Sequence, residues 1–84
     1  MEDTYETMRR DMMISEEISK IQEAYGKIEE IEDDDHTDGV ERISQLNEII
    51  KNVGKMNVHD EVYNQKDSVV EHAKDLVNRI ASSL

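Results

Sequence analysis

The sequence contains no cysteine, proline, phenylalanine or tryptophan. Without cysteine there are no disulfides, no thiolate zinc sites and no thiol catalysis. Without proline, nothing in the composition forbids long helices. No apolar run approaches the ~20 residues of a membrane span, and the first ten residues lack the apolar core of a secretory signal. We therefore expect a soluble, cytoplasmic protein that does not bind a membrane.

Positive charge is also scarce. The 84 residues include 21 acidic and 10 basic side chains, which gives a net charge of −11. Such a chain is repelled by nucleic acid and by anionic lipid surfaces, so we expect no direct contact with either. The length allows a single small domain over residues 1–84.

The acidic residues are concentrated in the first half of the chain. Residues 1–39 hold 14 acidic and 4 basic side chains, whereas residues 40–84 hold 7 and 6. The densest stretch has seven acids in the ten positions 29–38. Negative charge is therefore a local feature of one segment rather than a general property of the chain.

Apolar residues recur every three or four positions along most of the chain, which is the period of an amphipathic helix. No window alternates over more than a few positions, so strands are not expected. The pattern predicts an all-α fold, a small bundle of three antiparallel helices over about residues 3–32, 40–53 and 58–82. The three apolar stripes are Ile14, Ile18, Ile21, Tyr25 and Ile28; Val40, Ile43, Leu46, Ile50 and Val53; and Val58, Val62, Gln65, Val69, Ala73, Leu76, Ile80 and Leu84.

Acidic residues and glycines mark the joints between these helices. Residues 33–39 are predicted to form an acidic loop, because anions are unfavourable at a helix C-terminus. Gly39 and Gly54 are expected to supply left-handed turns, and Asn57 is expected to cap the third helix. Gly26 lies inside the first helix, either because another helix packs closely there or because a glycine is simply tolerated.

The first thirteen residues allow two interpretations. Met8 and Met12, together with Met1 and Tyr5, lie on a side of the helix roughly 150° from the following apolar stripe. Either one long helix runs from about residue 3, which we favour, or the helix restarts at Ser15. Residues 1–13 either are frayed, cap the bundle, or form an adaptable methionine surface for a partner.

The acidic loop partly matches the pattern of a calcium-binding loop. With Asp34 in the first position of an EF-hand pattern, Gly39 falls correctly at the sixth, but Gln45 replaces the required glutamate at the twelfth. A weak divalent site at Asp33, Asp34, Asp35 and Asp38 stays as an alternative to a solvated loop, which we favour. We therefore expect no metal and no cofactor.

Catalytic groups are also not apparent. His36, His59 and His72 are not spaced as a metal site, and each is expected at the surface. No serine lies in a sharp glycine-flanked turn, and the three scattered glycines form no phosphate-binding loop. We expect the protein not to be an enzyme.

The charge distribution favours an interaction protein. A helix and loop that carry most of the charge would present carboxylates to a basic surface of a protein partner. In composition the chain resembles small phage or viral inhibitors that imitate the charge of DNA. The alternatives are that acidity only maintains solubility, or that an adaptor bundle works through an apolar groove. The predicted contact residues are Glu16, Glu17, Glu23, Glu29, Glu30, Glu32, Asp33, Asp34, Asp35, Met8 and Met12.

The core predicted from the stripes is thin, because its residues are aliphatic and the chain has only three aromatic side chains. A marginal helical chain often gains stability from a second copy or a partner. A homodimer or a heterocomplex is therefore expected, with a self-contained monomeric bundle as the alternative.

Overall fold

The computed structural model describes residues 2–84 and the side chains of residues 7–84. It contains three helices, α1 (Glu2–Asp33), α2 (Gly39–Gly54) and α3 (Asp60–Ser82). Within the described range no residue belongs to a strand, so the all-α prediction is confirmed, with helix ends within two residues of those expected. No helix in that range has both the length and the apolar character needed to cross a bilayer.

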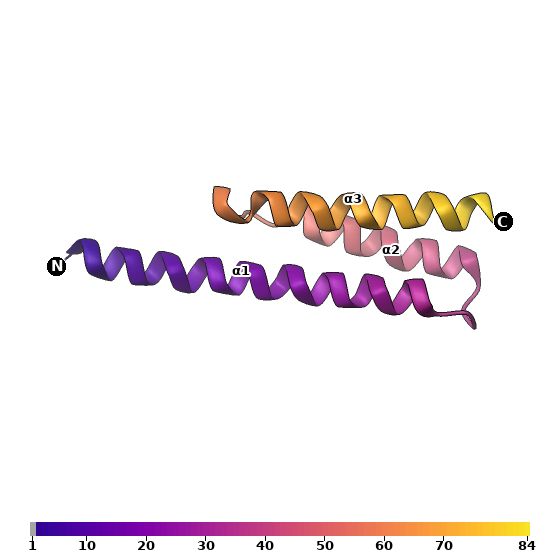
Figure 1. The fold of residues 1–84 in the computed structure, drawn as a ribbon, viewed down its shortest axis with the longest axis horizontal. Helices are drawn as coiled ribbons and strands as arrows, with labels where there is room; N and C mark the ends of the chain where they lie inside the picture. The colour runs from indigo at the N-terminus through magenta and orange to yellow at the C-terminus, as the bar shows by residue number, and fades with distance from the viewer. Residues whose placement is uncertain (1) are drawn as a thin grey trace.

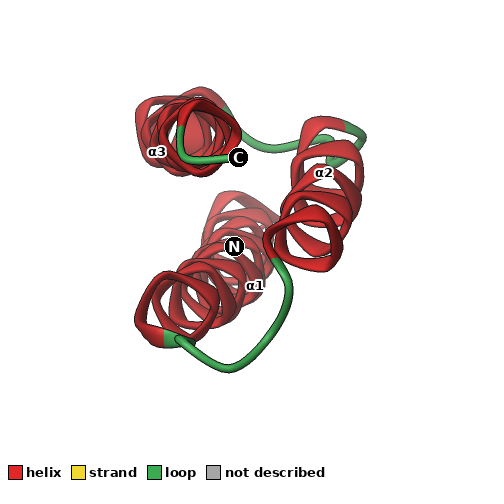
Figure 2. Ribbon diagram, turned by 90° about the vertical axis from the view of Figure 1, so that its right-hand side faces the viewer, coloured by secondary structure: helices red, strands yellow, loops and turns green. Residues whose placement is uncertain are grey.

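The helices lie side by side and alternate in direction, so that α1 and α3 run the same way and α2 runs back between them (Figure 1). Seen from one end, the three axes form a triangle (Figure 2). The bundle is an elongated rod with extents of 58 × 18 × 14 Å. Its N-terminal end consists of α1 alone, because α1 continues past the start of α3 (Figure 1).

Aliphatic side chains from all three helices fill the centre of the triangle. Ile28, Leu46 and Val62, one from each helix, are completely inaccessible to solvent. Four predicted stripe members are exposed and lie outside the core: Tyr25, Val40, Gln65 and, beyond the end of α3, Leu84. The buried residues are Ile21, Ile28, Ile31, Leu46, Val53, Val62, Val69, Ala73, Leu76 and Ile80.

The predicted helix ends need three corrections. No residue of the described backbone has a positive φ, so neither Gly39 nor Gly54 makes a left-handed turn. Gly39 is the first residue of α2, and Gly54 is the last. The chain leaves α2 through Lys55 in right-handed conformation, and the Lys55 N–H donates to the Lys51 carbonyl at 3.2 Å. The N-cap of α3 is the extended residue His59 rather than Asn57.

A single helix covers the N-terminal segment, with no restart at Ser15. Every residue from Thr7 to Met13 is exposed, and we call this stretch the overhang. Met8 and Met12 lie in it, with 62% and 67% of their surfaces accessible. Met1 and Tyr5, the other members of the predicted methionine face, lie outside the residues whose side chains are described.

Gly26 is tolerated in α1 without any close packing. A Cβ atom placed there would meet nothing within 4 Å, and the backbone is helical.

Replacing glycine by alanine at an exposed helix interior stabilises by about 0.5–1 kcal/mol. Gly26→Ala should therefore raise the urea midpoint, measured by far-ultraviolet circular dichroism. A lowered midpoint would mean that another chain covers this part of α1 in solution.

Candidate protein-interaction surface

One side of α1 lies away from the buried core and forms the outer edge of its grooves with α2. Glu16, Glu23 and Glu30 are exposed on it at intervals of seven residues, which is two helical turns or about 10.5 Å. This side lies about 150° around the helix from buried Ile21 and Ile28. The α1 outer face, as we define it, consists of Met8, Met12, Glu16, Glu23 and Glu30.

The carboxylates of this face have little internal neutralisation. Among the described residues, Glu16 and Glu30 form no ion pair, and Glu23 meets Lys27 only at 3.8 Å, with both side chains well exposed. In α3, Asp75 pairs with Arg79 at 3.1 Å, whereas the contact of Glu71 with Lys74, at 4.0 Å, is as long and as exposed as that of Glu23. Glu16 and Glu30 are therefore exposed carboxylates that have no ion-pair partner among the described residues.

The loop that follows α1 is organised by Asp34. Its Oδ1 accepts hydrogen bonds from the backbone N–H groups of His36 at 2.9 Å and Thr37 at 3.1 Å, and the Thr37 hydroxyl donates to Oδ2. The Thr37 hydroxyl and then these two N–H groups hold the pKa of Asp34 below its ordinary value. Within the described part of the chain, no group of three or more acidic or histidine side chains is placed to hold a metal ion.

Arg42, in the first turns of α2, closes the C-terminus of α1. Its guanidinium donates to the Ile31 carbonyl at 3.0 and 2.7 Å and to the Glu32 carbonyl at 3.1 Å. The last turn of α1 contains no basic residue of its own. A cation is favourable at the negative end of a helix, so Arg42 satisfies exposed carbonyls and offsets the neighbouring acids.

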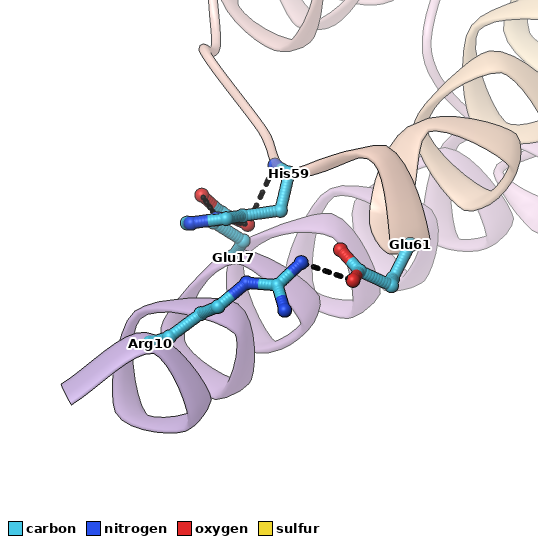
Figure 3. A network of polar contacts seen from close by, with 4 residues as sticks. All are labelled: Arg10, Glu17, His59 and Glu61. Atoms are coloured by element: carbon cyan, nitrogen blue, oxygen red, sulfur yellow. Dashed lines mark hydrogen bonds and ion pairs between the residues drawn. The ribbon is translucent and has the colours of Figure 1, made fainter. Parts of the chain in front are cut away.

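Two contacts join the first half of α1 to the start of α3 (Figure 3). Both carboxylate oxygens of Glu17 lie near Nδ1 of His59, at 3.0 and 3.1 Å, and one accepts the His59 backbone N–H at 3.2 Å. Arg10 forms an ion pair with Glu61. The backbone N–H of Glu61 itself, and then Arg10, lower the pKa of that carboxyl.

These contacts correct the expectation that His59 lies free on the surface. Its side chain is only 28% exposed, and the Glu17 side chain is 13% exposed. Sequence reasoning placed Glu17 among the contact residues because of its charge. Its partner is 42 positions away, so the local pattern gave no signal of the pairing.

A second histidine also lies between α1 and α3. His72 Nε2 lies 3.5 Å from Glu32 Oε2, and its ring centroid lies 5.5 Å from that of Tyr25. His72 is therefore half-buried rather than a free surface residue, whereas His36 is exposed as expected. A hydrogen bond to Glu29, together with the Glu29 charge, raises the pKa of Tyr25.

The predicted contact residues thus separate into two groups. Glu17, Glu23, Glu29, Glu32 and Asp34 have partners within the chain. The others are exposed on α1 or at its acidic end: Met8, Met12, Glu16, Glu30, Asp33 and Asp35.

Two open grooves accompany α1. The groove between α1 and α2 has a volume of about 490 Å³ and includes Lys27, Glu30 and Glu48. The groove between α1 and α3, of about 390 Å³, has no charged lining residue. The sequence carries little signal of this second groove: Gln65 is the one polar member of its stripe. The groove is lined by Ile21, Gln22, Tyr25, Asn64, Gln65, Ser68 and Val69.

Comparison with known proteins gives no relative: no family model, curated protein or solved structure matches this chain.

Arg42→Ala should destabilise the fold by about 1–2 kcal/mol, because it leaves carbonyls at the end of α1 without a charged donor. The measurement is urea unfolding followed by circular dichroism. Arg42→Lys keeps the charge but cannot span the Ile31 and Glu32 carbonyls with a planar fork, so it should restore only part of the loss. An unchanged midpoint for Arg42→Ala would contradict this role.

Asp34→Asn should destabilise the fold at neutral pH but much less in acid. A group whose pKa is lowered in the folded state adds stability above its unfolded pKa, and this stability is lost as the pH falls through the folded value. The difference between the urea midpoints of the native chain and the variant should therefore become smaller as the pH falls below 3.8, the ordinary pKa of an aspartate. A gap that stays constant from neutral to acidic pH would show that Asp34 acts without its charge.

Proposed function

We propose that this chain is a small protein-interaction module whose α1 outer face and acidic end bind a basic surface of a protein partner. Occupying a surface by which the partner binds nucleic acid would make the module an inhibitor. In this role it would resemble proteins that imitate the charge of DNA.

One observation carries the proposal. Glu16, Glu23 and Glu30 project from one face of a continuous helix, and no basic side chain of the described residues forms an ion pair with Glu16 or Glu30. Helix-borne carboxylates at fixed spacing focus the field, which speeds and orients docking onto lysine and arginine. If the acids served solubility alone, they would need neither a shared face nor regular spacing.

A second candidate is an adaptor that receives a partner helix in the groove between α1 and α3. The absence of charged lining in that groove favours this alternative, because the exposed Tyr25 ring offers apolar area there in an otherwise highly charged protein. Binding there would depend little on salt, whereas binding through carboxylates depends on it strongly.

The test uses the immobilised chain to capture proteins from an extract of its source cells at low salt. A partner of the proposed kind should elute as salt rises from about 50 to 300 mM, because the Debye length shortens to below 10 Å. Duplex DNA should also displace it. The triple variant Glu16→Gln, Glu23→Gln, Glu30→Gln should lose capture.

The matched control removes the same number of charges from α3, with Asp67→Asn, Glu71→Gln and Asp75→Asn. All three positions are exposed, so both variants should stay folded. The control should retain capture. Equal capture by the native chain and the α1 variant would reject the proposal, and capture that resists salt would favour the groove.

A further inference from the structure

The α1 outer face has two chemically different parts in one line. Along the helix, Met8 and Met12 are followed by Glu16, Glu23 and Glu30, at steps of four, four, seven and seven residues. On an α-helix these positions fall within a sector of about 80°. The face is therefore apolar at its N-terminal end and anionic beyond it.

The overhang is held so that the methionines point away from the bundle. Arg10 lies on the inner side of α1 and pairs with Glu61 at the start of α3 (Figure 3). This ion pair links the overhang to α3 on the side of α1 that faces the bundle. Met8 and Met12 lie on the opposite side and are about two-thirds exposed. Adjacent methionines form an adaptable apolar contact surface.

We propose that the partner presents a basic amphipathic helix that lies along this face. Seven-residue spacing of the acids matches lysine or arginine spaced by seven on a second helix, as in the flanking ion pairs of coiled coils. Apolar side chains near one end of that helix would cover Met8 and Met12. The inference rests on the proposed function and specifies the partner's chemistry.

The probe is a helical alanine- and glutamine-rich peptide of about four heptads, with three lysines seven residues apart and two leucines four residues apart near one end. One version of the peptide has the leucines near its N-terminus and the other near its C-terminus, because the two helices can run parallel or antiparallel. A control peptide of identical composition spaces the lysines by five residues, which turns each about 140° from the last. Binding is followed by fluorescence anisotropy at low salt.

One of the two matched peptides should bind at least about tenfold more tightly than the control peptide. Met12→Gln should weaken this binding about tenfold, the cost of losing most of one buried methionine contact. Met13→Gln is the matched variant, because Met13 is also exposed but lies about 100° around the helix. It should change binding less than about twofold.

Equal binding of matched and control peptides, or equal losses for the two methionine variants, would overturn the inference. Circular dichroism of each variant checks that α1 stays helical. If the triple α1 glutamine variant still captures its partner, the proposed function itself fails. If that variant loses capture while Met12→Gln binds the matched peptide as the native chain does, the inference fails and the proposed function stands.

Discussion

The fold depends on how the chain ends a long helix in a cluster of acids. At the end of α1, the negative pole of the helix coincides with seven acidic residues in ten positions, and no basic residue is present in the last turn. Arg42, on the other side of the loop, offsets this negative charge because its guanidinium donates hydrogen bonds to the Ile31 and Glu32 carbonyls. The same contact sets where α2 begins relative to α1. The acidic charge of residues 1–39 and the arrangement of α1 and α2 are therefore linked.

Much of the fold could be predicted from the sequence, because burial depends on the period of the apolar residues. Ile21, Leu46 and Leu76 lie in stripes of helical spacing, and all three are buried. The helix ends were predicted less well. A glycine shows that a left-handed turn is allowed at Gly39 or Gly54, but the chain passes both in right-handed conformation.

The residue types at the candidate site could be predicted from the sequence. Which of the acids are exposed and which contact partners within the chain could not. Charge counting located the acids, yet it could not distinguish Glu16, which is exposed, from Glu17, which lies against His59. Likewise Asp34 differs from Asp35 only because the chain turns back and places the Thr37 hydroxyl and two N–H groups around it. The role of Glu17 depends on a contact that forms only when the helices pack. The role of Asp34 is local, because its partners lie two and three residues further on, and an Asx turn of this kind can be sought in the sequence.

Gly26 has a mechanical consequence for α1. Gly26 lies between Glu23 and Glu30 and has the weakest helical preference of any residue in α1. The distance between these two carboxylates therefore depends on the helix geometry at Gly26. With nothing packed against it, this turn has no tertiary contact that would resist bending. A docked surface that is slightly curved can be followed by bending at this one position, while Arg10 and Arg42 keep the two halves of α1 anchored to the bundle.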